Sequence, residues 1–159
     1  MFCRLLLSRM GYDRRWLLPK LAPPGCAKQW VRQQWPVEVE AQRKRHAASV
    51  LLAAIDADNL SPAREKANRE AELSLPRSPD EKIALFIPKW CIETWLQWLG
   101  GDHGVTEEEQ HPATPEDLRD ACRAAVEQYL QMAREGRDTG GALPALDMSF
   151  PEYNRLRRP

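Results

Sequence analysis

The sequence contains no apolar run close to the roughly 20 residues that a membrane-spanning helix needs. It has no internal repeat and no low-complexity tract. With 29% charged residues and six tryptophans, its composition is neither that of a disordered tail nor that of a coiled-coil rod. A length of 159 residues therefore favours one globular domain with a single core.

Cysteine is scarce, and the four cysteines are scattered without any Cys-x-x-Cys pair or any histidine at zinc-ligand spacing. This pattern argues against a zinc site and against a disulfide scaffold. The three histidines lie in polar surroundings and suggest no triad with a Ser or Cys nucleophile. Arg4 and Arg9 interrupt the apolar stretch at the N-terminus, unlike a signal peptide. We therefore expect a cytoplasmic protein with no membrane segment.

Net charge is also absent, with 23 Lys and Arg against 23 Asp and Glu, but the charge is unevenly spread. Residues 1–48 hold ten basic and three acidic residues, whereas residues 49–110 hold six and twelve. A basic first third is compatible with phosphate binding, and Arg43, Lys44 and Arg45 are its densest cluster. A solvated basic surface is the alternative.

Two short apolar runs, residues 50–55 (VLLAAI) and 83–87 (IALFI), predict parallel strands that are buried on both faces. Residues 14–21 are a weaker candidate for an edge strand, because Pro19 interrupts them. Helical periodicity surrounds these runs, over residues 2–10, 28–46, 61–73, 92–99 and 114–135. The alternation predicts an α/β fold with a small, mainly parallel sheet flanked by helices.

We expect residues 1–135 to form this α/β domain. Periodicity is lost after Gly136, so residues 136–159 predict an irregular tail that packs on the same domain. Inside the domain, Pro36 is expected to kink the second helix or to restart it, and Ser61 is expected to cap the third.

The most informative motif is Asp56-Ala57-Asp58, directly after the first apolar run. Functional groups in open α/β sheets gather at the carboxyl ends of the strands. Two carboxylates two residues apart can offer hard oxygen ligands there, which suits Mg²⁺ or Mn²⁺. Asp and Asn also favour the turn that ends a strand, so a plain turn is the alternative.

Two further residues are expected near this edge. Glu93 lies near the start of the helix after the second strand and is a candidate acid or base, although a carboxylate there also suits the helix dipole. Lys89 follows the second strand and could contact a phosphate, or could be an ordinary exposed lysine. Trp90, Trp95 and Trp98 suit a stacking platform for bases or, for Trp95 above all, a core.

The chain resembles the small bacterial stand-alone branch of the Toprim superfamily in its order of strand, Asp-x-Asp, helix and strand and in the sequence segments IDAD and IPKWCIETWL. Relatives in that branch include the Toprim domains of old-family nucleases. The resemblance covers most of residues 1–135. It implies a Toprim-like fold, a magnesium pair at Asp56 and Asp58, action on nucleic acid phosphodiesters, and an ABC-type ATPase as partner.

This sequence departs from that family at the first strand, whose glutamate acts in the family as general acid or base or as a further metal ligand. No residue here matches it, because the first helix begins at the N-terminus. We expect either an upstream extension or loss of that acid, and an exposed strand edge that favours homo-oligomers. Three interpretations follow: a metal-dependent nuclease, a degenerate interaction module that docks on a partner protein, and an unrelated α/β fold in which DADN is a turn.

Overall fold

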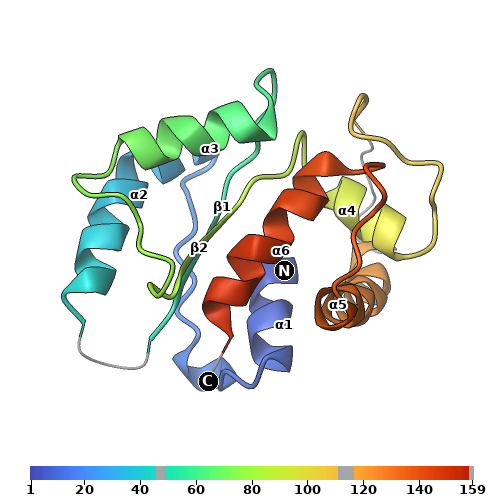
Figure 1. The fold of residues 1–159 in the computed structure, drawn as a ribbon, viewed down its shortest axis with the longest axis horizontal. Coiled ribbons are helices and arrows are strands. Elements are labelled where there is room, and N and C mark those ends of the chain that lie inside the picture. The colour runs from blue at the N-terminus through green and yellow to red at the C-terminus, as the bar shows by residue number, and fades with distance from the viewer. Residues whose placement is uncertain (46–48, 111–116, 158–159) are drawn as a thin grey trace.

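The computed structural model describes residues 1–45, 49–110 and 117–157, the side chains of residues 117–120 excepted. Within these ranges six α-helices, one short 3₁₀ helix and two strands follow one another (Figure 1). Their bounds are α1 (Phe2–Arg9), η1 (Arg14–Trp16), α2 (Ala27–Arg43), β1 (Leu51–Ala54), α3 (Pro62–Ala71), β2 (Ile83–Phe86), α4 (Ile92–Leu99), α5 (Asp117–Glu135) and α6 (Pro144–Leu156). In these ranges no helix combines the length and apolar character that crossing a bilayer requires.

The sheet consists of β1 and β2, which run parallel with Leu51 opposite Ile83 and Ala54 opposite Phe86. Helix α3 connects the two strands, as a parallel pair requires. The predicted α/β fold with a small parallel sheet is thus confirmed for the described residues. The two strands differ in burial: β2 is buried at every position, whereas β1 is half-buried and ends at the exposed Ala54. The prediction of burial on both faces is right for β2 and wrong for β1.

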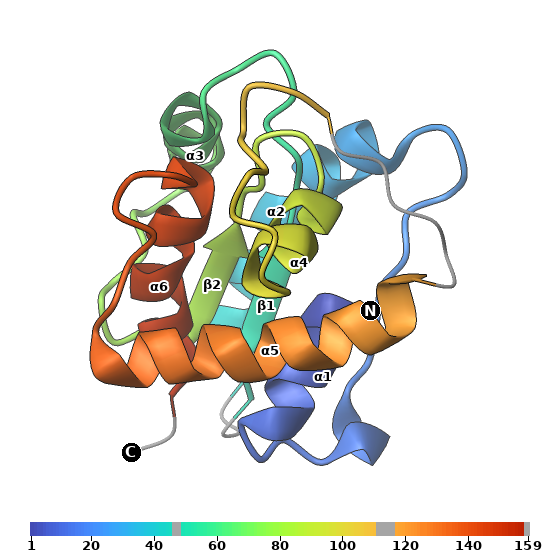
Figure 2. The same ribbon diagram turned by 90° about the vertical axis from the view of Figure 1, so that its right-hand side faces the viewer.

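Helices cover both faces of the sheet (Figure 2). Because successive side chains of a strand point to opposite faces, Ile83 and Leu85 pack with Trp35 of α2, whereas Phe86 packs with the helices of the other face. There Phe86 lies 6.0 Å from the Trp95 ring of α4 and 6.1 Å from the Tyr129 ring of α5, between ring centroids. The structure therefore has two apolar cores, one on each side of the sheet.

The predicted start of α3 is confirmed. Ser61 caps α3, since its hydroxyl accepts the Arg64 N–H at 3.2 Å, and Pro62 takes the first helical position. Helix α2 runs through Pro36 without a restart and ends at Arg43, earlier than expected. The start of α5 predicted at Thr114 and Pro115 lies outside the described residues.

Two further predictions are wrong. Residues 14–21 form no strand: Asp13 accepts the Arg15 N–H at 2.9 Å and caps the turn η1, and beyond it Pro19 has no N–H for a ladder. Residues 136–159 are not an irregular tail, since α6 occupies Pro144–Leu156. This helix packs on β2. Pro144 suits the start of the helix, because the first N–H groups of a helix have no partner within it, so the missing N–H of proline costs no hydrogen bond there.

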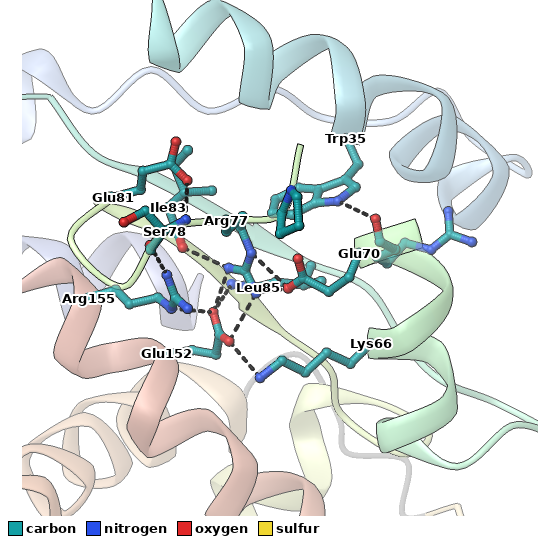
Figure 3. Close-up of polar contacts among 12 residues, drawn as sticks. Trp35, Lys66, Glu70, Arg77, Ser78, Glu81, Ile83, Leu85, Glu152 and Arg155 are labelled. Carbon is teal, nitrogen blue, oxygen red and sulfur yellow. Dashed lines mark hydrogen bonds and ion pairs between the residues drawn. The ribbon is translucent and has the colours of Figure 1, made fainter. Parts of the chain in front are cut away.

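A buried ionic cluster covers the edge of β2 that faces away from β1 (Figure 3). Glu152 of α6 accepts the Leu85 N–H at 3.0 Å, and Arg77 donates to the Ile83 carbonyl at 2.7 Å. Side chains thus make the backbone hydrogen bonds that a further strand would otherwise supply. As a result, β2 is closed on both sides.

Candidate functional site

The chain stays paired with the β2 segment beyond the end of β1. Ile55 N–H donates to the Phe86 carbonyl at 3.0 Å, and Ala57 N–H donates to the Pro88 carbonyl at 2.8 Å. Ile55 and Ala57 are buried, whereas Asp56 between them is exposed. Both strands end at this edge, so Asp56 lies at the carboxyl edge of the sheet, as predicted.

Asp58 turns the chain away from the sheet. Its φ of 53° lies in the left-handed region, which Asp tolerates better than most residues. Its N–H donates to the Lys89 carbonyl at 2.7 Å. Its carboxylate accepts from Lys28 Nζ at 2.7 Å, and the same ammonium reaches the Ala57 carbonyl at 3.0 Å. Asp58 therefore both forms the turn and carries a charge that Lys28 already partners.

Lys89 reinforces the same turn. Its ammonium donates to the carbonyls of Asp58 at 2.6 Å and Leu60 at 2.9 Å, and lies 4.5 Å from the Trp90 ring centroid. These contacts hold the positive charge beside the Asp56–Asp58 loop. The predicted phosphate contact by Lys89 would use a cation that already has backbone partners.

Glu93 contributes a third negative charge. It lies in the first turn of α4, close enough to act on Asp56. Partial burial first, and then the charges of Asp58 and Glu93, together raise the pKa of Asp56 from its ordinary 3.8 to about 6, against the opposing effect of Lys28. Asp56 is thus still partly protonated near neutral pH, although its carboxylate keeps contact with solvent.

Magnesium fits this edge in only one form. In the part of the chain that the structure describes, no three His, Cys, Asp or Glu side chains converge closely enough to enclose a metal ion. An ion held by Asp56 and Asp58, with water and phosphate oxygens as its other ligands, fits the donors that are present. Lys28 would then have to give up part of its contact with Asp58.

The basic cluster predicted as a phosphate contact lies elsewhere. Helix α2 precedes β1 and is antiparallel to it. Residues 43–45 therefore lie at the amino edge of the sheet, at the far end from Asp56 (Figure 1). Arg43 is engaged there: its Nε donates to Glu81 Oε1 at 2.7 Å, and its Nη2 donates to the Leu75 carbonyl at 3.0 Å. Lys44 and Arg45 are exposed. Within one chain, the three basic residues and the acidic pair are not brought together.

Sequence reasoning missed Lys28 as a residue of this edge. Its place follows only from the direction of α2, because a helix antiparallel to the following strand has its first turn at that strand's carboxyl end. The three tryptophans also divide differently than expected. Trp95 is fully buried, as the apolar stripe indicates, but Trp98 is also buried, which leaves no three-ring platform for bases. Trp90 is half-buried and donates to the Glu107 carbonyl at 3.1 Å.

No family model, no curated protein and no solved structure matches this chain. The resemblance to the Toprim superfamily therefore stays an expectation from two short sequence segments.

Proposed function

We propose that the carboxyl edge of the sheet binds Mg²⁺ through Asp56 and Asp58 and that the protein acts there on nucleic acid phosphodiesters. The observation that carries the proposal is the gathering of three carboxylates, Asp56, Asp58 and Glu93, at one edge of a parallel sheet. A chain selected only for stability gains nothing from this mutual repulsion. A divalent cation removes it.

The charges around the edge support a phosphate ligand as well as a metal. Lys28 and Lys89 place two ammonium groups beside the three carboxylates. When bound, Mg²⁺ would neutralise phosphate charge and lower the pKa of a coordinated water. Glu93 is the further carboxylate whose charge acts on Asp56, and it is assigned the role of general acid or base.

A non-enzymatic interaction module is the second candidate. The ion pair between Lys28 and Asp58 favours it, because that pair satisfies Asp58 without a metal. In this alternative the Asp56–Asp58 loop is a structural turn, and the protein functions by docking on a partner.

Calorimetric titration with MgCl₂ and MnCl₂ tests the metal site in wild type, Asp56→Asn, Asp58→Asn and the double variant. We expect binding in wild type and none in the double variant. Asp80→Asn is the matched control, because Asp80 is an exposed aspartate in the turn before β2, at the other edge of the sheet. Equal binding by wild type and the double variant would eliminate the metal site.

Nicking of supercoiled plasmid tests the reaction. Activity should require Mg²⁺, disappear with EDTA, and fall by about 10²–10⁴-fold in Glu93→Gln. Metal binding without nicking would favour the interaction module. If nicking occurs and is unaffected by Glu93→Gln, the assigned role of Glu93 is wrong.

A further inference from the structure

The second edge of β1 is open. Leu51 N–H donates to the Lys82 carbonyl at 2.9 Å and Ile55 N–H donates to the Phe86 carbonyl at 3.0 Å. Because peptide groups of a strand point alternately to its two sides, the N–H and C=O groups of Leu52 and Ala54 point away from β2. No described residue hydrogen-bonds to them, and Ala54 is exposed. This contrasts with β2, whose outer edge is covered by Arg77 and Glu152.

Exposed apolar side chains lie on the same side of the molecule. The connection from η1 to α2 runs on the β1 side of the sheet rather than the β2 side (Figure 2). In it and at the end of η1, Trp16, Leu18 and Leu21 are 79%, 84% and 83% exposed. Exposed large apolar side chains on the side of a sheet that carries an unpaired strand are typical of a contact surface.

The distribution of charge along β1 favours a second copy of this chain as the partner. Asp56 follows the strand at its carboxyl end, and among the described residues it makes no close ion pair. The exposed residues Lys44 and Arg45 lie at the amino end of the strand. Arg45 Nη1 donates to Gln42 Oε1 at 3.4 Å, and Gln42 Nε2 donates to the Ser49 carbonyl at 2.9 Å, which holds Arg45 near the start of β1. An antiparallel copy of β1 would therefore place positive charge opposite negative charge at both ends. A parallel partner strand would place like charges together.

We propose that two copies of this chain associate through their β1 edges, antiparallel and around a two-fold axis at Ala53. In this register Leu52 and Ala54 of one copy exchange backbone hydrogen bonds with Ala54 and Leu52 of the other. Asp56 then lies opposite residue 50 of the second copy, beside that copy's Arg45. The result is a continuous four-stranded sheet with the order β2-β1-β1-β2.

The association brings the basic residues to the acidic edge. Lys44 and Arg45 of one copy lie beside Asp56 of the other, although they are at opposite ends of the sheet within each chain. If the carboxyl edge binds nucleic acid phosphates, the second copy supplies the cations that one chain lacks there. This consequence rests on the proposed function, whereas the pairing of the strands does not.

Sedimentation equilibrium of the full chain in EDTA, without nucleic acid, tests the pairing separately from metal binding. We expect a dimer that weakens with rising salt. Ala54→Pro removes an N–H that does not bond to β2, so it should weaken dimerisation by about tenfold or more and leave the circular dichroism unchanged. A monomeric wild type, or a folded Ala54→Pro variant that dimerises normally, would overturn the proposal.

A charge exchange tests the register and does not depend on the proline variant. Asp56→Lys and Arg45→Glu should each dimerise poorly, since each places like charges opposite one another. An equimolar mixture of the two variants should form a heterodimer, because both ion pairs are then restored with reversed sign at one end. If the mixture stays monomeric while both variants are folded, the antiparallel register is wrong.

Discussion

Arg77 and Glu152 form a buried ion pair that takes the place of a strand at the outer edge of β2 (Figure 3). Arg77 Nη1 lies 2.7 Å from Glu152 Oε2, and the side chains are only 1% and 2% exposed. Glu152 also accepts from Lys66 at 2.7 Å, and Arg77 pairs with Glu70. Each charge therefore has several partners, and together they connect α3, β2 and α6.

Glu152→Gln should lower the free energy of unfolding by about 3–5 kcal/mol, because it removes the buried carboxylate from the Arg77 guanidinium and leaves only the partly exposed Glu70 to balance that charge. Burial by itself would raise the pKa of Glu152, but Arg77 and Lys66 outweigh it and hold the pKa below its ordinary value. The stabilisation is thus complete above the unfolded-state pKa near 4.5 and is lost as the pH falls. Urea denaturation at pH 7 measures the difference in the free energy of unfolding between wild type and Glu152→Gln.

Glu127→Gln is the matched control, because Glu127 pairs with Arg9 at 3.0 Å with both side chains more than half exposed. It should lower the free energy of unfolding by less than about 1 kcal/mol.

The double variant Arg77→Met/Glu152→Leu separates charge from backbone capping. Buried ion pairs are often replaced by apolar side chains without loss, but here Leu85 N–H and the Ile83 carbonyl would be left unsatisfied. A double variant as stable as wild type would show that this capping is unimportant.

Arg43 should act on stability more than on nucleic acid binding. It is tied to Glu81 and to the carbonyls of Leu75 and Pro76, so Arg43→Gln should cost about 1–3 kcal/mol. Lys44→Gln, one residue along in an exposed position, should leave the stability within about 0.5 kcal/mol of wild type. Urea denaturation compares the two variants.

Binding of a fluorescent oligonucleotide over a range of salt concentrations gives the complementary result. Lys44→Gln should flatten the salt dependence of any binding, since each phosphate contact releases counterions. Arg43→Gln should leave the slope unchanged. The opposite pattern would return Arg43 to the nucleic acid interface.

The strands and α3 could be predicted because their signals are local. VLLAAI and IALFI are short apolar runs, and Ser61-Pro62 is a capping signal within one turn. The position of Asp56 follows from the first run alone. Helix α6 could not be predicted in this way, because Pro151 lies inside it and its stability comes from packing on β2.

Long-range pairing was equally inaccessible. Glu152 and Arg77 are 75 residues apart, and nothing in either segment indicates the other. The same holds for Lys28 and Asp58, 30 residues apart, until the direction of α2 relative to β1 is known. The sequence therefore predicts which residues lie at an edge of the sheet, whereas their charge partners depend on the assembled fold.

Lys28→Met should strengthen Mg²⁺ binding if Asp58 is a ligand. The substitution keeps an unbranched side chain of similar length and removes the ammonium that now lies 2.7 Å from Asp58 Oδ2. We expect the dissociation constant to fall by about 3–10-fold, which corresponds to roughly 1 kcal/mol for a partly exposed pair. Calorimetry measures the change, with Lys20→Met as a control from the preceding connection. Unchanged or weaker binding would show that Asp58 is not a ligand.

Asp56→Asn should make the protein more resistant to urea at neutral pH in EDTA. The pKa of Asp56 is about 6 in the folded chain against 3.8 for the ordinary group, so the unfolded state loses this proton first. Wild type is therefore destabilised by Asp56 as the pH rises from about 3.8 to about 6, and the asparagine variant has no such loss. The free energy of unfolding of the variant should exceed that of wild type by nearly zero at pH 4 and by about 1 kcal/mol at pH 7.5, a value reduced for solvent screening of an exposed carboxylate.

Urea denaturation at low protein concentration measures this difference, with Asp80→Asn showing no such dependence on pH. Saturating Mg²⁺ should reverse the order, because the cation stabilises wild type and not the variant. If Asp56→Asn destabilises the protein equally at both pH values, neither burial nor the neighbouring carboxylates raise the pKa of Asp56, and the electrostatic argument for a metal site at this edge fails.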